Sequence, residues 1–394
     1  MKGTTKTGIT LPVLALLSAL ALASCAHFHS TPSDEAPGTS LWAYQTAAEL
    51  WAPLTLHEGI LLFGSDDGTV TALDVASQRV RWSAITGGRV RSTVAVVGES
   101  AYFASDDGYL YAVGLADGQR RWRFDLGSRE MQRMLPSLDP PYDYDYLMSS
   151  PTVAAGVLYV GSADGHLYAI DTDSGQQRWR FKTGGKIRSP PIVAQNRVHF
   201  GSWDGHVYAL DAGTGSQLWR FDTGSIIQGS PAMAGGNVII GSRSARIFAL
   251  DAATGSVAWT YVFTDGSWVE SSPVLDGSTL YIGTSDALKL VALDVNSGDL
   301  KWHFETGGWS WGAPVVAKGT VYIGGISASP YYFEGVDLIR GLYAVDAATG
   351  LERWRMQPAV MSGYVTGGVF ASVAVDDDVI YAASIDGMIH ALRR

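Results

Sequence analysis

Hydrophobic and polar positions along this 394-residue chain repeat with a period of about forty residues. The stretches that begin at residues 157, 197 and 237 share one order of short alternating runs and glycine-containing turns. Alternation with period two is typical of strands, so the pattern predicts an array of short strands rather than helices. Seven repeats end in a tryptophan, at Trp82, Trp122, Trp179, Trp219, Trp259, Trp302 and Trp354.

The repeat that starts at residue 157 shows how the pattern translates into strands. Alternating residues predict strands over Leu158–Gly161 and His166–Asp171. Asp164–Gly165 lies between them and predicts a two-residue type I′ turn, because that turn needs positive φ at both positions. An outer strand is expected over Gln177–Phe181, and the segment 189–193 opens the next unit as its innermost strand. Four strands per repeat are typical of a propeller blade.

The number of blades follows from the two ends of the chain. An eighth repeat, VIYAASIDGMIHAL, runs out at Arg394 before its tryptophan. Leu41–Tyr44 resembles the missing outer strand, because it matches Leu218–Phe221. Pairing the two chain ends would remove the free sheet edges that invite aggregation. We therefore expect an all-β, eight-bladed β-propeller over residues 40–394, in which the N-terminal strand closes the last blade; seven blades is the alternative if the Trp42 segment is only a linker.

The N-terminus has the features of an export signal. Lys2 and Lys6 precede the apolar run Leu11–Ala23, which is too short for a membrane-spanning helix of about 20 residues. The run ends in Leu-Ala-Ser-Cys, which resembles the lipobox of bacterial lipoproteins, where the cysteine after the cleavage site is acylated. Cys25 is the only cysteine in the chain, so it is the only residue that could be acylated in this way. Lipidation of this kind attaches several acyl chains to one residue, and more than one chain gives stable membrane anchoring.

The resemblance to lipoproteins divides the chain into three parts. We expect a signal peptide over residues 1–24, a lipidated flexible tether over residues 25–39 that is rich in Ser, Thr, Pro and Gly, and then the propeller. Ala26 follows the lipidated cysteine, and the lack of aspartate there favours the outer membrane, by resemblance to lipoprotein sorting in Gram-negative bacteria. The expected location is the periplasmic face of the outer membrane.

Composition and charge narrow the classes of partner. With 46% apolar and 17% charged residues, the chain can bury a large core. Its formal net charge of −10 argues against nucleic acid, because phosphate binding needs clustered Lys and Arg. We therefore expect contact with the membrane through the lipid anchor and not through a basic surface.

One segment of the repeat resembles a known family. Ala249–Trp259, with the sequence ALDAATGSVAW, is similar to the tryptophan-docking motif of quinoprotein-type propellers, and the resemblance extends over nearly all of the chain from Leu41 to Leu392. Quinoprotein dehydrogenases of this superfamily hold pyrroloquinoline quinone beside calcium over the propeller axis. The BamB family comprises non-catalytic lipoprotein subunits of the outer-membrane β-barrel assembly machinery. The lipobox, the chain length and the closing strand resemble the BamB family.

The sequence lacks the residues that the quinoprotein branch implies. Quinoprotein alcohol dehydrogenases carry a vicinal cysteine pair, a calcium site of Glu and Asn, and a catalytic Asp, but no cysteine follows Cys25. Asn196, Asn237 and Asn296 fall at turns within repeats. We therefore expect no catalytic residue, no metal and no cofactor. Pyrroloquinoline quinone and calcium belong only to the alternative function.

Positions at which the repeats disagree are candidates for a binding site. Just before each innermost strand the chain crosses toward the central channel, and the residues there vary between blades. Three tryptophans at these places lie outside the repeat's own tryptophan position, and two arginines occupy equivalent places on separate blades. A plug of the channel is the alternative role for these side chains. The predicted binding mouth comprises Arg91, Arg188, Gln228, Trp268, Glu270, Trp309 and Trp311.

Two insertions break the period. Ser128–Leu147 and Ala328–Ile339 add aromatic and methionine residues, and loops of this kind on a rigid scaffold suit partner recognition. The candidate partner-binding residues are Met131, Met134, Tyr142, Tyr144, Tyr146, Tyr331, Tyr332 and Phe333.

The resemblance to the BamB family implies a function. We expect a non-catalytic periplasmic scaffold that assists outer-membrane β-barrel assembly and binds the assembly complex through propeller loops. The alternative is a quinoprotein-like oxidoreductase, or a carbohydrate-active or carbohydrate-binding propeller, that uses the mouth rich in Trp and Arg.

Overall fold

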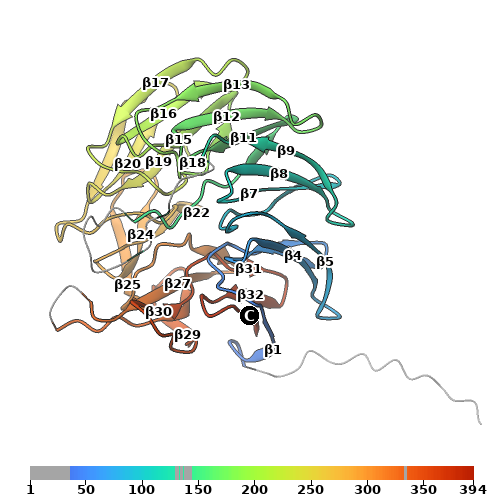
Figure 1. Ribbon diagram of the computed structural model, residues 1–394. Helices are drawn as coiled ribbons and strands as arrows, with labels where there is room; N and C mark the ends of the chain where they lie inside the picture. Colours follow the sequence, from blue (N-terminus) through green and yellow to red (C-terminus); the bar gives the residue numbers. More distant parts are fainter. Residues whose placement is uncertain (1–35, 129–132, 134–135, 137–143, 332–334) are drawn as a thin grey trace, which may run out of the picture. The chain divides into compact units, whose positions relative to one another are not determined.

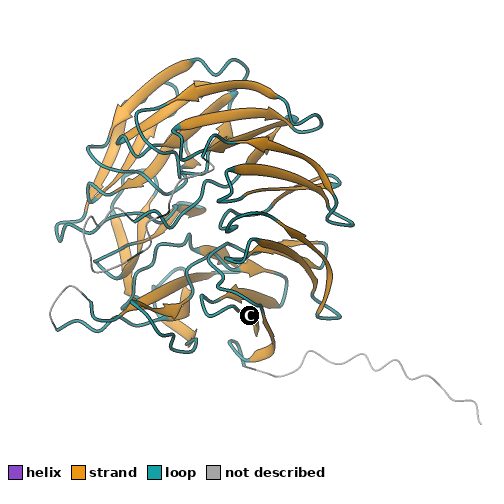
Figure 2. Cartoon of the chain, viewed as in Figure 1, coloured by secondary structure: helices purple, strands orange, loops and turns teal. Residues whose placement is uncertain are grey.

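The computed structural model describes residues 36–128, 133, 136, 144–331 and 335–394. All regular structure in this part of the chain is β-strand (Figure 2). The strands form eight antiparallel sheets that follow one another in sequence order around a ring (Figure 1). The predicted eight-bladed propeller is confirmed, and the seven-bladed alternative is wrong. Among the described residues, no helix has the length and apolar character needed to cross a bilayer.

Each sheet is one blade, and we name the blades A to H along the chain. From the axis outward, the strands of the first four blades are β2 (Thr55–His57), β3 (Ile60–Gly64), β4 (Thr69–Asp74) and β5 (Arg79–Ile85) in blade A; β6 (Ala95–Val97), β7 (Ser100–Ala104), β8 (Tyr109–Gly114) and β9 (Arg120–Asp125) in blade B; β10 (Thr152–Ala154), β11 (Val157–Gly161), β12 (His166–Asp171) and β13 (Gln177–Lys182) in blade C; and β14 (Ile192–Ala194), β15 (Arg197–Gly201), β16 (His206–Asp211) and β17 (Gln217–Asp222) in blade D.

The remaining blades repeat this order, with one extra strand in blade G. Their strands are β18 (Ala232–Ala234), β19 (Asn237–Ser242), β20 (Arg246–Asp251) and β21 (Val257–Val262) in blade E; β22 (Val274–Asp276), β23 (Thr279–Gly283), β24 (Lys289–Asp294) and β25 (Leu300–Glu305) in blade F; β26 (Val315–Ala317), β27 (Thr320–Ala328), β28 (Gly341–Asp346) and β29 (Glu352–Met356) in blade G, with β30 (Val365–Gly368) paired to β27; and β31 (Ala374–Val375), β32 (Val379–Ala383), β33 (Met388–Arg393) and β1 (Ser40–Gln45) in blade H.

The N-terminal strand closes blade H. β1 pairs with β33 in antiparallel register, with Trp42 opposite Ala391 and Gln45 opposite Met388. In Figure 1 the blue β1 accordingly lies beside the red strands of the C-terminus. The predicted closing strand is therefore confirmed, and it supplies the outer strand that the eighth repeat lacks.

The turn between the second and third strands differs from the predicted type. Of the pair Asp164–Gly165, only Gly165 has a positive φ, +81°. Its N–H donates to the carbonyl of Ser162 at 3.1 Å, so the turn comprises residues 162–165 and Gly165 is its last residue, not a central one. The carboxylate of Asp164 accepts from the backbone N–H of His166 at 2.8 Å and from the hydroxyl of Tyr168 at 2.7 Å. The predicted type I′ turn is wrong, because these bonds stabilise a longer turn in which only glycine adopts positive φ.

Each repeat tryptophan packs on a glycine of the following blade. The indole N–H of Trp179 donates to the carbonyl of Ala212 at 3.0 Å. Gly215 has φ +73°, and a Cβ there would lie 2.6 Å from the Trp179 ring. These tryptophans therefore join neighbouring blades and are part of the packing. The same contact recurs in the pairs Trp82–Gly118, Trp122–Gly175, Trp219–Gly255, Trp259–Gly298 and Trp302–Gly350.

The closing blade reproduces this glycine contact with the N-terminal segment. Gly38 has φ +84°, and a Cβ there would lie 2.9 Å from the ring of Trp354. Its N–H donates to the carbonyl of Arg393 at 2.7 Å, and the N–H of Arg393 donates to the carbonyl of Thr39 at 2.8 Å. The two chain ends thus form, without a covalent link, the turn that joins the third and fourth strands elsewhere.

The connections divide the propeller into two faces. Neighbouring strands in a blade are antiparallel, so the turn between the second and third strands and the link to the next blade lie at the same end. We call this end the mouth face, and the other end the opposite face. The insertion in 128–147 connects β9 to β10 and the insertion in 328–339 connects β27 to β28, so both join strands at the mouth face.

Candidate functional site

Residues that precede the innermost strands converge around the propeller axis. Four of the predicted residues, Arg91, Gln228, Glu270 and Trp311, line one cavity of about 340 Å³. All eight blades contribute to its wall, so the cavity lies on the propeller axis. We call it the axial cavity.

Arg91 is buried and paired with a carboxylate of the neighbouring blade. Its Nε and Nη2 donate to the two oxygens of Asp66 at 2.8 and 2.5 Å. The guanidinium also lies 4.6 Å from the ring centre of Trp51, which is a cation–π distance. Burial lowers the pKa of Arg91, and the charge of Asp66 opposes this shift. Arg91 is therefore held in place by contacts within the protein.

The described part of the first insertion brings two charged residues into the mouth. Arg133 donates to both oxygens of Asp106 and, through Nη1, to the backbone carbonyl of Asp145 at 2.7 Å. The carboxylate of Asp145 is fully buried and accepts from Arg188 at 2.6 and 2.7 Å and from Lys186 at 3.0 Å. Burial alone would raise the pKa of Asp145, but the positive charges around it outweigh burial and lower it.

Glu270 forms a second buried charge cluster. One carboxylate oxygen accepts from Arg243 Nε at 2.5 Å and from Gln228 Nε2 at 2.8 Å, and the other accepts from the hydroxyl of Tyr146. The guanidinium of Arg243 lies 4.4 Å from the ring centre of Trp268, which places this predicted tryptophan at the edge of the cluster. Burial and then the charge of Glu270 raise the pKa of Tyr146, so this phenol remains protonated.

Aromatic rings from three segments stack across the mouth. Tyr146 stacks on Trp311 at 4.4 Å between ring centres, and Trp311 stacks on Trp309 at 4.7 Å. Phe370 meets the edge of Tyr146 at 5.5 Å. These side chains are at most 4% exposed, so the stack fills the mouth side of the axis. This arrangement fits the plug that was the alternative role for the mouth residues.

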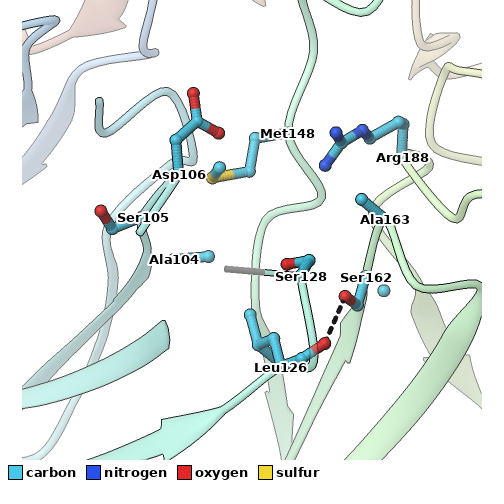
Figure 3. A pocket seen from close by; sticks show the side chains of 10 residues that line it. Ala104, Ser105, Asp106, Leu126, Ser128, Met148, Ser162, Ala163 and Arg188 are labelled. Carbon is cyan, nitrogen blue, oxygen red and sulfur yellow. Dashed lines mark hydrogen bonds between the residues drawn. The ribbon is translucent and has the colours of Figure 1, made fainter. Parts of the chain in front are cut away.

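A second and much smaller cavity lies between blades B and C. It measures about 20 Å³, which suits one water molecule, and Arg188, Asp106 and Met148 contribute to its wall (Figure 3). Figure 3 also shows the hydroxyl of Ser162 donating to the carbonyl of Leu126 at 2.7 Å. Arg188 thus lies beside this small cavity and does not line the axial one.

Three of the eight predicted partner-binding residues lie in the described parts of the chain, and none of these three is fully exposed. Tyr144 and Tyr146 are 4% and 0% exposed, so in this structure they pack inside the mouth and do not present a partner surface. Tyr331 is half-buried, donates to Asp286 at 3.0 Å and meets the edge of Trp309. The residues that lie outside the described parts of the chain are Met131, Met134, Tyr142, Tyr332 and Phe333.

Sequence reasoning missed one repeated position that contributes to the site in blades A, B, D and E. This position directly follows the serine that begins the turn between the second and third strands. In blades A and B it holds Asp66 and Asp106, which pair with the mouth residues Arg91 and Arg133. On blades D and E the same position holds Trp203 and Arg243, and the guanidinium carbon of Arg243 lies 5.9 Å from the ring centre of Trp203. Variation between repeats after an otherwise regular serine was a signal that could have found them.

A third expansion of the mouth face was also missed. The link from β29 to β31 is longer than in other blades and contains β30, which pairs with the end of β27. The apolar side chains of this link pack with the aromatic stack, for example Met361 and Val365. The sequence 357–373 contains no tryptophan that would have marked it as a candidate binding segment.

The axis does not fit a quinone–calcium centre. Calcium needs several oxygen ligands, but both oxygens of Glu270 already accept hydrogen bonds from protein side chains. In the described parts of the chain, no group of three or more His, Cys, Asp or Glu side chains is arranged to hold a metal ion.

Solved structures share the fold. BamB from Moraxella catarrhalis superimposes with a TM-score of 0.69 at 16% identity, over 91% of this chain and 100% of that chain. Sqt1 from Saccharomyces cerevisiae has a TM-score of 0.70 at 14% identity, over 91% and 100%. Quinohemoprotein alcohol dehydrogenase from Comamonas testosteroni has a TM-score of 0.67 at 14% identity, over 90% and 76%. At these identities the likeness concerns the fold alone.

The sequence itself matches a family. No curated protein matches this chain. A family model described as outer membrane protein assembly factor BamB matches residues 32–149, 137–267 and 203–329, which together span most of the chain. The repeats and the closing strand have the order that the sequence resemblance implied. The chain therefore belongs to the family described as outer membrane protein assembly factor BamB.

Proposed function

We propose that this protein is a non-catalytic periplasmic scaffold, anchored by a lipid at Cys25, that assists the assembly of outer-membrane β-barrel proteins. Membership of the BamB family supports the assembly role. The charged side chains of the mouth support a non-catalytic role, because Arg91, Asp145 and Glu270 are buried and paired within the protein. General acid–base catalysis needs a group that is free to exchange a proton with the substrate, whereas these groups are held in ion pairs.

The observation that carries this proposal is the expanded mouth face of blade G. The β27–β28 hairpin and the β29–β31 link present the apolar side chains of Val336, Ile339 and Val360, which are 38%, 42% and 66% exposed. We call these three residues the blade-G patch. These side chains are exposed on the two loops that extend the mouth face beyond a regular blade, so the blade-G patch is the proposed contact with the assembly complex.

The N-terminal segment enters the propeller away from the mouth face, which leaves that face accessible to a partner. Gly38 takes the place of a third-to-fourth strand turn, and such turns lie on the opposite face. The chain therefore enters the propeller, at Gly38, on the face that does not carry the blade-G patch.

A pull-down tests the proposed role. Tagged full-length protein from solubilised outer membranes should enrich the β-barrel assembly complex, and a preparation that enriches none of its subunits contradicts the assembly role.

Cys25→Ser tests the lipid anchor. The substitution should abolish incorporation of labelled fatty acid and move the protein to the soluble periplasmic fraction. Retention of that variant in the membrane fraction contradicts the lipid anchor.

A further inference from the structure

The axial cavity has the size and wall of a small-molecule site. Its volume of about 340 Å³ lies within the range of ligand pockets in proteins. Hydroxyl-bearing residues from five blades contribute to the wall, together with prolines and the edge of the aromatic stack. The hydroxyl-bearing residues are Thr93, Ser150, Ser230, Ser272 and Ser372.

Three side chains of this wall carry a buried polar atom without a hydrogen-bond partner among the described residues. They are Nη1 of Arg91, Nε1 of Trp311 and Oε1 of Gln228. The side chains are 3%, 3% and 1% exposed. The orientation of the Gln228 amide follows from its neighbours, because Nε2 faces two acceptors, Glu270 Oε1 at 2.8 Å and the carbonyl of Tyr144 at 3.3 Å.

Unpartnered polar atoms of this kind are uncommon in folded proteins, because a buried donor or acceptor that loses its hydrogen bond to water is left uncompensated. The three residues come from blades B, E and G, so they approach the axis from different directions. In this conformation solvent does not reach the three atoms, so a molecule in the axial cavity contacts them only when the side chains turn toward it. Small movements of these side chains toward such a molecule would satisfy all three atoms.

The charges of the wall select the class of molecule. The guanidinium of Arg91 is paired with Asp66, and the carboxylate of Glu270 is paired with Arg243. An anion or a cation would therefore bring an uncompensated charge into a buried site, which is unfavourable. A hydroxyl group both donates and accepts hydrogen bonds, so a neutral molecule with several hydroxyls matches two donors and one acceptor.

We propose that the axial cavity binds a neutral polyhydroxylated molecule, a mono- or disaccharide, through Arg91, Trp311 and Gln228. This site is separate from the blade-G patch and does not depend on the assembly role. Failure of sugar binding leaves the pull-down result unchanged, and failure of the pull-down leaves sugar binding unchanged.

Titration of the full-length protein with D-glucose, maltose and the anion glutarate tests this site. Calorimetry should show saturable binding of glucose or maltose, and the indole N–H signal of Trp311 should shift in ¹H–¹⁵N NMR spectra. The signal is assigned by its loss in Trp311→Phe. That variant keeps one aromatic ring in the stack and loses the N–H together with the rest of the indole, so we expect it to fold and to bind the sugar about tenfold more weakly.

Trp302→Phe is the matched control. The indole N–H of Trp302 donates to the carbonyl of Ala347 between blades F and G, away from the axial cavity, so sugar affinity should be unchanged. Absence of saturable binding by both sugars overturns the proposal. Binding of glutarate without sugar binding overturns the neutral class. Sugar binding that leaves the Trp311 signal and the Trp311→Phe affinity unchanged overturns the location.

Discussion

At the scale of single residues, His199 departs most from its repeat. In β15 it takes the place held by Tyr159 in blade C and Tyr281 in blade F, whose hydroxyls donate to backbone carbonyls at 3.1 and 3.0 Å. The imidazole is 0% exposed and packs on Trp219, and neither ring nitrogen has a hydrogen-bond partner within the described chain. Burial, together with the charge of Arg197, lowers the pKa of His199 to about 4.

This histidine should make stability fall as the pH falls from about 6.5 to about 4. The unfolded chain binds a proton below its ordinary pKa, whereas the folded protein binds it only near pH 4, so acid favours the unfolded state. The loss over this interval is about 3 kcal/mol. His199→Leu should remove it and raise the free energy of unfolding at acidic pH. Urea unfolding at several pH values measures the effect.

His303→Leu serves as the comparison, because His303 lies on the outer strand of blade F with its side chain about half exposed, at 48%. It should leave the slope of stability against pH close to that of the wild type. An equal pH slope in wild type and His199→Leu would show that the buried imidazole does not govern acid stability.

At the scale of elements, the closing strand depends on one glycine. Gly38 combines positive φ with direct contact to the Trp354 ring, whereas Gly224 has a similar φ, +81°, and no atom lies within 4 Å of the place that a Cβ would occupy there. Gly38→Ala should therefore destabilise the protein by about 1–2 kcal/mol more than Gly224→Ala. Both variants strain the backbone, but only the Cβ at position 38 also collides with a tryptophan ring. Equal unfolding free energies for the two variants would contradict this role of Gly38.

The buried ion pairs of the mouth should be costly to break. Asp145→Asn leaves Arg188 and Lys186 without a compensating charge, and loss of one partner from a buried pair costs about 3–5 kcal/mol. Because Tyr146 follows directly and stacks on Trp311, the near-ultraviolet circular dichroism of the stacked rings should also weaken. Asp377→Asn breaks an exposed pair with Lys318 and should cost at most about 1 kcal/mol. Similar losses for both variants would argue against the buried pairs as the support of the mouth.

The elements show what could be predicted from the sequence and what could not. The strands, the blade number and the closing strand follow from the repeat, because each blade meets the same packing requirement. The turn at Asp164 was mispredicted, since an Asp-Gly pair alone does not reveal that the aspartate carboxylate accepts from the backbone N–H of His166 and so shifts the turn. The burial of Tyr146 was not foreseen either, because its partners Glu270 and Trp311 lie on distant blades and no local pattern indicates that contact.

At the scale of the whole molecule, the departures from the repeat are concentrated on one face. The first insertion packs into the mouth in its described part, and the two expansions of blade G surround the aromatic stack and present the blade-G patch. The opposite face retains regular turns and the entry of the chain at Gly38. A regular ring that carries its variation on one face is suited to hold a partner, and the central claim is that this partner contacts the blade-G patch.

The most direct measurement of that claim is the yield of the β-barrel assembly complex in pull-downs of two variants of blade G. The double variant Ile339→Asp, Val360→Asp changes the blade-G patch, and Leu351→Asp changes an equally apolar side chain, 69% exposed, in the β28–β29 turn of the opposite face. With both variants folded, we predict at least a tenfold loss of the complex for the double variant and wild-type yield for Leu351→Asp. Wild-type yield from the double variant, or the same loss from both, would contradict the account.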